Sequence, residues 1–317
     1  MTRIAVVGES LVDAVRLADG AERETPGGAP FNVAIGIARL GGTVRLLTAI
    51  GDDARGRLLT QRLKADGVHA SFHQLPRTSV ARAEIETNGS ASYNFDIDGS
   101  FDLTPSMRAA LAVADAVHVG SIAAHLPPGA QRITEVFRDL QGTALLSYDP
   151  NCRPSITPNV KTVRAEVETF ASIADVVKAS DEDMTWLYPD IPYTEVAAMW
   201  LRLGAGLVVV TRGAAGIWCR NGSGREASIP TLPTTVVDTI GAGDSCMAAL
   251  IVCLTQLGAS GSKASARLSA LTSRELKDIL RTAAQVASIT CSREGANPPT
   301  AAELERISPT ATTLSNP

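Results

Sequence analysis

The segment Thr235-Val-Val-Asp-Thr-Ile-Gly-Ala-Gly-Asp-Ser-Cys-Met-Ala-Ala-Leu250 carries the strongest structural signal in the chain. Its first residues predict a short apolar strand, and its last residues predict an apolar helix. The glycines at 241 and 243 let a ligand approach the backbone, and the first N–H groups of the helix have no partner within it. The turn between strand and helix is therefore expected to bind an anion.

Asp244 lies in the first turn of this helix, beside the same N–H groups. A passive phosphate site would not place a carboxylate there, because the two negative charges repel each other. The arrangement suits phosphoryl transfer, in which Asp244 takes a proton from an attacking hydroxyl group and the Gly241, Ala242 and Gly243 turn stabilises the transferred group. The alternative is an ordinary glycine turn with an aspartate that caps a helix.

The bulk composition is that of a globular protein and not of a disordered chain. Apolar residues make up 45% and charged residues 20% of the 317 positions, and the formal net charge is −4. This charge gives no reason to expect a nucleic-acid partner. No apolar run is as long as a transmembrane helix, and the apolar part of the N-terminus is too short for a signal peptide, so we expect a cytoplasmic protein without a membrane partner.

Short apolar runs alternate with helical patterns from one end of the chain to the other. The clearest runs span residues 3–7, 44–50 and 206–211, and they are typical of strands buried on both faces of a parallel sheet. We therefore expect a three-layer α/β/α fold with a mainly parallel central sheet. A doubly wound dehydrogenase fits this alternation too, but the first run leads into Gly8-Glu9-Ser10 and lacks the G-x-G-x-x-G of a dinucleotide site.

The pattern changes between residues 73 and 102, where polar and apolar residues alternate on both sides of Asn88-Gly89. This dipeptide is a strong hairpin signal. We expect segments 13–27 and 73–102 to form a small β lid on a single domain of residues 1–307, with a plain surface hairpin as the alternative. Residues 308–317 have the composition of a disordered tail.

Two motifs carry a family resemblance that spans nearly the whole chain. Asp238-Thr-Ile-Gly-Ala-Gly-Asp244 resembles the C-terminal signature of the ribokinase-like (PfkB) carbohydrate kinases, and Gly27-Gly28-Ala-Pro-Phe-Asn32 resembles their N-terminal signature. The resemblance implies the ribokinase-like fold and an ATP-dependent sugar kinase that uses Mg²⁺. It also implies that the lid covers the sugar and makes the contacts of a homodimer.

The sugar-binding residues follow from this resemblance. Gly8-Glu-Ser-Leu-Val-Asp13 and Asp149-Pro-Asn-Cys-Arg153 are similar to segments of fructokinase-like members, which implies sugar or phosphate contacts by Asp13, Gly28, Asn32, Asn151 and Arg153. A turn carboxylate, a local cap and a surface arginine are the alternatives for Asp13, Asn32 and Arg153. Relatives that use ribose or phosphorylated sugars often carry Lys where this chain has Ala29, so we expect an unphosphorylated sugar, with fructose first.

Ser180-Asp-Glu-Asp183 stands where the family usually has Asn-x-x-Glu, which links the nucleotide phosphates and magnesium. Asp183 is shorter than Glu by one methylene, so its contact with hydrated magnesium is expected to run through water. Capping of the following helix by Ser180 is the alternative. The stretch Thr211-Arg-Gly213-Ala-Ala-Gly216 is similar to the family segment that approaches the nucleotide.

Cys291-Ser-Arg293-Glu-Gly295 resembles the family segment that encloses a monovalent cation together with the aspartate at the start of the C-terminal signature. The implied shell is Asp238 with carbonyl oxygens near Ile240, Arg293 and Gly295, and the implied ion is potassium.

Rival functions remain at this stage. A kinase for 2-keto-3-deoxygluconate or for a nucleoside would share the fold, but a sugar acid needs a cation near its carboxylate, and the lid stretch from Tyr93 to Asp98 is acidic. A non-catalytic sugar- or nucleotide-binding protein is the rival outside enzymes. The intact Asp244 argues against it.

Overall fold

A computed structural model describes residues 2–16, 22–85 and 91–307 of the chain, and its core is a nine-stranded sheet. All neighbouring strands from β11 to β5 pair in parallel, and the last two strands at the other edge pair antiparallel. The predicted mainly parallel sheet is therefore confirmed. In spatial order the strands are β13 (Glu226–Ile229), β12 (Ile217–Asn221), β11 (Leu207–Thr211), β10 (Val176–Ser180), β9 (Leu145–Asp149), β8 (Ala116–Gly120), β1 (Arg3–Val7), β4 (Thr43–Gly51) and β5 (His69–Leu75).

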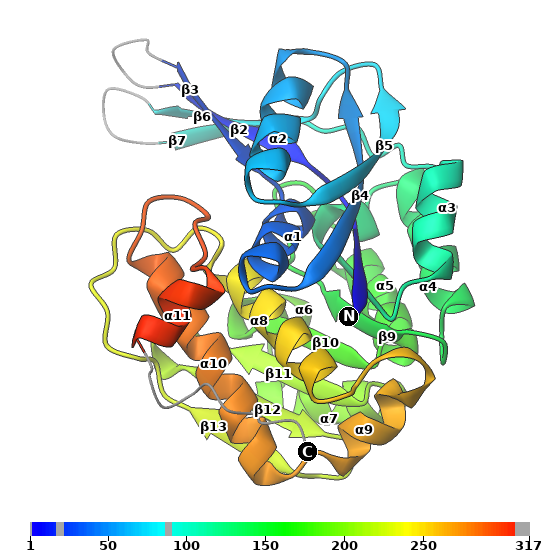
Figure 1. Cartoon of the computed structure of the whole chain (residues 1–317), viewed down its shortest axis with the longest axis vertical. Coiled ribbons are helices and arrows are strands. Elements are labelled where there is room, and N and C mark those ends of the chain that lie inside the picture. The colour runs from blue at the N-terminus through cyan, green and yellow to red at the C-terminus, as the bar shows by residue number, and fades with distance from the viewer. Residues whose placement is uncertain (1, 17–21, 86–90, 308–317) are drawn as a thin grey trace.

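Helices cover both faces of this sheet (Figure 1), which explains why β8 and β9 are buried at every position. One apolar core lies beneath α1 (Ala29–Arg39), α2 (Ala54–Ala65), α8 (Ala242–Gln256), α9 (Ala264–Ala270) and α10 (Ser273–Cys291). The other core lies beneath α3 (Pro105–Ala112), α4 (Gly129–Asp139), α5 (Val160–Ile173), α6 (Asp181–Leu187) and α7 (Tyr193–Leu203). The short helices η1 (Ser121–Ala124), η2 (Gly213–Ala215), η3 (Gly261–Lys263) and α11 (Ala301–Ile307) complete the chain.

A second, four-stranded sheet projects from one end of the molecule, where β2, β3, β6 and β7 lie together (Figure 1). Its order is β3 (Glu22–Gly27), β2 (Leu11–Arg16), β6 (Val80–Ile85) and β7 (Ala91–Asp96). The predicted pairing of the later two strands is confirmed, while the turn at Asn88-Gly89 and the tail 308–317 lie outside the described residues. β5 runs to Leu75 within the central sheet, so the second lid segment begins after residue 75 and not at 73.

The structure corrects two other expectations. Residues 235–237 form no strand: Val236 and Val237 are 60% and 62% exposed, and the Val237 N–H donates a hydrogen bond of 2.8 Å to the Cys291 carbonyl in place of a neighbouring strand. Beta-branched residues favour an extended backbone, but they do not create a place in a sheet. The stretch Gly258-Ala-Ser-Gly-Ser-Lys-Ala-Ser after α8 has the composition of a flexible loop, yet it folds into η3 and the start of α9.

Two exposed ion pairs connect β3 of the lid to the rest of the chain. Arg55 on α2 lies 2.5 Å from Glu24, and Arg23 lies 2.5 Å from Glu294 in the loop after α10.

Among the described residues, no single helix has the length and apolar character needed to cross a bilayer. α8 and the segment 261–270 are long and apolar enough only when taken together, and they meet at a bend of 95°.

Candidate active site

The N-termini of α1 and α8 meet at the edge where the parallel strands end. The two helices pack side by side (Figure 1) on the face of the sheet that holds α10. A Cβ atom at Gly36 would lie 2.7 Å from the Cβ of Ala248, so only glycine allows the helices to come this close. This crossing determines the distance between the side chains at the two helix starts.

Asn32 and Asp244 are the side chains that this crossing brings together. The Asn32 Nδ2 group donates a hydrogen bond of 2.8 Å to Oδ2 of Asp244, and both residues are buried. Burial raises the pKa of Asp244, while the Asn32 hydrogen bond and the positive charges of Lys178 and Arg153 oppose the rise. The result is an oriented carboxylate with a raised pKa, which suits a general base.

The turn before α8 keeps its backbone N–H groups free of side-chain caps. Gly241 adopts φ 75°, and a Cβ there would lie 2.6 Å from the Cβ of Ala296. The chain therefore needs glycine at this position both for its left-handed backbone and for space. Uncapped amides at the start of a 15-residue helix fit an anion such as a phosphoryl group.

A buried ion pair lies beneath this turn, and the sequence analysis did not identify it. The Nζ atom of Lys178 in β10 is 2.7 Å from Oδ2 of Asp149 in β9, and it donates to the Gly243 carbonyl at 3.3 Å. Both side chains are 5% exposed. A single lysine within the apolar run 176–179 was the available signal, since an isolated lysine is rarely buried without a partner.

The loop after β9 carries two of the predicted sugar or phosphate contacts. Asn151 has φ 38°, its N–H donates to Asp149 Oδ1 at 3.2 Å, and its Nδ2 donates to Ser121 Oγ at 3.4 Å. The exposed Arg153 donates to the carbonyls of Asn151 and Cys152 at 3.3 and 3.0 Å. Its positive charge opposes the rise that burial causes in the pKa of Asp13 and of Asp244.

Asp13 lies on β2 of the lid, opposite Thr25 of β3. Burial raises its pKa to about 6, although the charge of Arg153 opposes this rise. A Cβ at Gly27 would lie 2.2 Å from Asp13 Oδ2, and one at Gly28 would lie 2.8 Å from the Glu9 carbonyl oxygen. The Gly27-Gly28 pair therefore provides space for Asp13 and for the chain that leaves β1.

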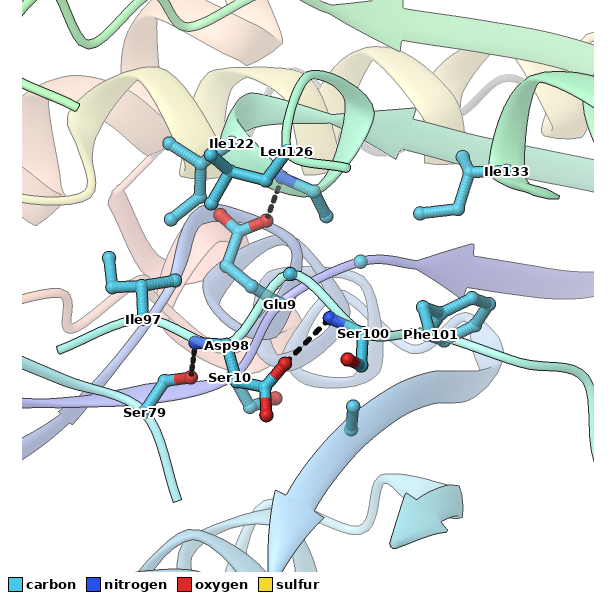
Figure 2. A pocket seen from close by; sticks show the side chains of 14 residues that line it. Glu9, Ser10, Ser79, Ile97, Asp98, Ser100, Phe101, Ile122, Leu126 and Ile133 are labelled. Carbon is cyan, nitrogen blue, oxygen red and sulfur yellow. Dashed lines mark hydrogen bonds between the residues drawn. The ribbon is translucent and has the colours of Figure 1, made fainter. Parts of the chain in front are cut away.

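A small pocket of about 30 Å³, with room for only one or two water molecules, lies beside this chain segment. Figure 2 shows Glu9 near its centre, with Ile122 and Leu126 above it in this view. Glu9 accepts a hydrogen bond of 3.0 Å from the Ala123 N–H, and burial raises its pKa to about 7. The lining residues are Gly8, Glu9, Ser10, Ala49, Ser79, Ile97, Asp98, Gly99, Ser100, Phe101, Ile122, Ala123, Leu126 and Ile133. The sequence analysis did not identify Glu9 or Asp98, although Glu9 directly follows the first strand.

Ser180 and Asp183 form a capping box at the start of α6, so the capping alternative for Ser180 is confirmed. Asp183 Oδ2 accepts from the Ser180 N–H and hydroxyl at 3.0 and 2.7 Å, and Oδ1 accepts from Cys152 N at 2.8 Å. Each carboxylate oxygen already has a donor. A magnesium ion fits this group only through a bridging water, as the shorter side chain predicted.

The predicted nucleotide segment begins beside Ser180, because Thr211 pairs with it across β10 and β11. Gly213 has φ 47°, and no atom lies within 4 Å of where its Cβ would be, so its open side suits a ligand. Gly216 differs, since a Cβ there would lie 2.1 Å from the Ile229 carbonyl oxygen. Packing of the chain itself explains Gly216.

The predicted monovalent-cation segments also come together. Asp238 accepts from Ile240 N through Oδ1 and from Gly295 N through Oδ2, each at 2.9 Å. The side chain of Arg293 pairs with Glu303 at 2.9 Å, which leaves its backbone as the group toward a cation. No group of three or more His, Cys, Asp and Glu side chains that could hold a metal occurs in the described part of the chain. One carboxylate with backbone oxygens suits a hard cation and not a transition metal.

Comparison with known proteins gives one consistent result. A model of the pfkB family carbohydrate kinases matches residues 1–303. A fructokinase of Rhizobium leguminosarum bv. trifolii is 33% identical over 263 residues, which cover 79% of each chain.

The solved structures agree with this result. A fructokinase from Xylella fastidiosa with bound ATP superposes with a TM-score of 0.85 at 25% identity, over 96% of this chain and 98% of that one. A double mutant of the Vibrio cholerae fructokinase, with fructose, ADP and a potassium ion bound, gives a TM-score of 0.78 at 25% identity over 96% and 98% of the two chains. The expected three-layer fold is thus confirmed by the sheet and by these likenesses.

Proposed function

The chain belongs to the pfkB family of carbohydrate kinases and is a fructokinase-like, ATP-dependent phosphotransferase that acts on a sugar hydroxyl, and from this premise we propose its substrate and its catalytic residues. The substrate is an unphosphorylated sugar, fructose first, which receives the γ-phosphoryl group of ATP on a primary hydroxyl. Asp244 is the base, and the turn from Gly241 to Asp244 binds the transferred group. The observation that carries the proposal is the Asp244 carboxylate, held by Asn32 at the uncapped start of α8.

Asp244 removes the proton of the sugar hydroxyl as its oxygen attacks the γ-phosphorus. A new phosphorus–oxygen bond forms to the sugar, the bond to ADP breaks, and the proton stays on the Asp244 carboxylate until it leaves to solvent. Asn32 occupies Oδ2, so Oδ1 is the oxygen that accepts the proton. The amides of Gly243 and Asp244 in the first turn of α8 stabilise the negative charge on the phosphoryl oxygens in the transition state, while the Ala242 N–H already donates to the Thr239 carbonyl at 3.2 Å.

The pocket at Glu9 is too small to hold a sugar, but its lining favours a neutral polyhydroxyl substrate in the neighbouring site. Its polar lining consists of carboxylates, serines and backbone, and no Lys or Arg is among its lining residues. Carboxylates accept hydrogen bonds from hydroxyl groups, whereas they repel a sugar acid or a sugar phosphate. Asp13, Asn32, Asn151 and Arg153 complete the sugar site in this proposal, with Gly28 allowing the close approach.

ATP is proposed to lie along the ends of β10 and β11, near Ser180, Thr211 and Gly213, because Ser180 and Thr211 are paired neighbours and the open side of Gly213 follows them. Magnesium, when bound, neutralises charge on the ATP phosphates, with Asp183 as a partner through water. Potassium is proposed at Asp238 and the carbonyls of the 293–295 loop, as the Vibrio cholerae relative holds potassium. β3 and β7 lie at the two edges of the smaller sheet, and a homodimer is proposed to form through this sheet.

The test is ADP release by the purified protein with ATP and magnesium, across fructose, glucose, ribose, 2-keto-3-deoxygluconate and adenosine, with and without potassium. We expect fructose to stimulate ADP release most strongly. Asp244→Asn should lower kcat by about two orders of magnitude or more with little change in sugar affinity, while Asp139→Asn, an exposed change on α4, should match the wild type. Equal turnover of Asp244→Asn and the wild type would remove Asp244 from the role of base. Activity with the sugar acid or the nucleoside alone would replace fructose as the substrate.

A further inference from the structure

We infer that Lys178, paired with Asp149, is a positioning residue for the proposed reaction: it fixes the peptide that presents the Asp244 N–H to the phosphoryl group and places a permanent positive charge beneath the start of α8. This inference rests on the proposed function and adds two residues that lie behind the reacting groups.

The position of Lys178 in the sheet directs it to α8. Side chains alternate between the two faces of a strand, and Lys178 lies two residues from Val176, which packs in the core beneath α8. Val177 and Ala179, on either side, belong to the opposite core. The lysine thus crosses the layer between sheet and helix and ends at the Gly243 carbonyl.

The contact with Gly243 acts on Asp244 through a planar peptide. The carbonyl of Gly243 and the N–H of Asp244 belong to one trans peptide unit, so they point in opposite directions. A cation that holds the carbonyl from below therefore aims the N–H outward, to where the anion is proposed to bind. Preorganised donors of this kind stabilise charge without reorientation during the reaction.

Stability alone does not account for the ion pair. Burying two charges costs several kcal/mol per ion by general experience, and an apolar pair of similar size is often as stable. Burial disfavours the charged form of Lys178, but the carboxylates of Asp149 and Asp244 outweigh this effect and raise its pKa. The lysine therefore stays protonated at any pH where the protein works.

The charge of Lys178 also acts on the proposed base. The groups that face Asp244 are Asn32 from α1, Lys178 from β10, Arg153 from the loop after β9, and the negatively charged Asp149 from β9. Arg153 is exposed, so solvent and salt screen it, whereas Lys178 is buried and its effect is screened much less. Lys178 is thus the main fixed charge that keeps Asp244 ionised.

The test compares Lys178→Met with the double variant Lys178→Met, Asp149→Asn, in which no buried charge is left unpaired and the acceptor for the Asn151 N–H is kept. Lys161→Met, an exposed change on α5, is the matched control. We expect both test variants to lose at least about tenfold in kcat, with less than about threefold change in the sugar KM. In Lys178→Met the acid limb of the kcat–pH profile should move to higher pH by about one unit, because Asp244 loses a positive neighbour; in the double variant, which also loses the negative charge of Asp149, the shift should be smaller.

Recovery of wild-type kcat in the double variant would overturn the inference, since Lys178 would then only balance the charge of Asp149. ADP affinity, measured by calorimetry, gives a readout that does not need turnover, and we expect it to fall about fivefold or more in both variants. If the wild type releases no ADP with any sugar, the proposed function fails, and the ADP affinities alone decide the inference. Unchanged affinity in the double variant would then refute it. Thermal unfolding of each variant shows whether it is folded.

Discussion

Asn32 and Asp244 are 212 positions apart in the chain, and a hydrogen bond of 2.8 Å joins their side chains where α1 and α8 begin. The bond orients the Asp244 carboxylate and favours its charged form against the effect of burial. Asn32 thereby connects the N-terminal and C-terminal motifs in space. Its removal should affect both the orientation and the ionisation of the proposed base.

Asn32→Ala should lower kcat by about tenfold and move the acid limb of the kcat–pH profile to higher pH, because Asp244 loses a donor that favours its charged form. The measurement is kcat and the sugar KM from pH 5 to 9. Asn94→Ala, on lid strand β7, is an exposed control that should leave the acid limb in place. An unchanged acid limb in Asn32→Ala would mean that this hydrogen bond does not govern the ionisation of Asp244.

Glu9→Gln should stabilise the protein at high pH. Burial raises the pKa of Glu9 from 4.5 to about 7, so the folded state binds its proton more tightly than the unfolded state does. The ionised Glu9 therefore costs stability as pH rises through this window; the cost is absent below pH 4.5 and complete above pH 7. A shift of this size corresponds to about 3 kcal/mol.

Chemical unfolding at pH 8 and pH 4.5 measures the effect of Glu9→Gln. We expect the variant to be more stable than the wild type at pH 8 and equal to it at the lower pH. Glu305→Gln, exposed on α11, serves as the control. The same difference at both pH values would assign the effect to packing and not to charge.

Gly241→Ala should lower both stability and kcat. Its backbone has φ 75°, and the added Cβ would meet Ala296 at 2.6 Å, so the turn has to move. Gly258→Ala, at the other end of α8, is a matched control with φ 84° and no atom within 4 Å of the new Cβ. Both variants carry the strain of a left-handed alanine, about 1–2 kcal/mol. Only Gly241→Ala should lose more than this in unfolding free energy and also bind ADP more weakly; equal losses would show that the turn is not tightly packed.

The ion pair between Arg23 and Glu294 should affect substrate affinity more than stability. Both side chains are about two thirds exposed, and such pairs contribute at most about 1 kcal/mol to stability. The pair links lid strand β3 to the loop after α10, so Arg23→Glu should raise the sugar KM about two- to threefold by disfavouring a closed lid. The swapped pair Arg23→Glu, Glu294→Arg should restore the KM. A KM that stays raised in the swapped pair would assign the effect to another contact of Arg23.

The sequence was sufficient to predict the sheet, the lid pairing and the two helix starts, because each depends on local signals. Glycines, an aspartate in a first helical turn and apolar runs of strand length keep their meaning without knowledge of the neighbours. The same signals failed at Val236 and Val237, where β-branched residues predict an extended chain but the sheet has no place beside it. Whether a strand finds a partner is a property of the whole fold.

The buried charges could not be derived in the same way. Lys178 and Asp149 are 29 positions apart, and their pairing depends on β9 and β10 being neighbours in the sheet with one register. Glu9 has its role because η1 turns its backbone toward the end of β1. The sequence predicts Asp183 as a magnesium partner. It does not predict the hydrogen bond from the Cys152 N–H to Asp183, because this bond depends on where the loop after β9 lies.

The close crossing at Gly36 has a consequence for how this protein can evolve. Close packing of α1 against α8 at Gly36 fixes the distance between the two helix starts. A larger residue at position 36 would push α1 away from α8 and so separate Asn32 from Asp244, although position 36 lies in neither motif; it has to remain glycine whatever changes around it.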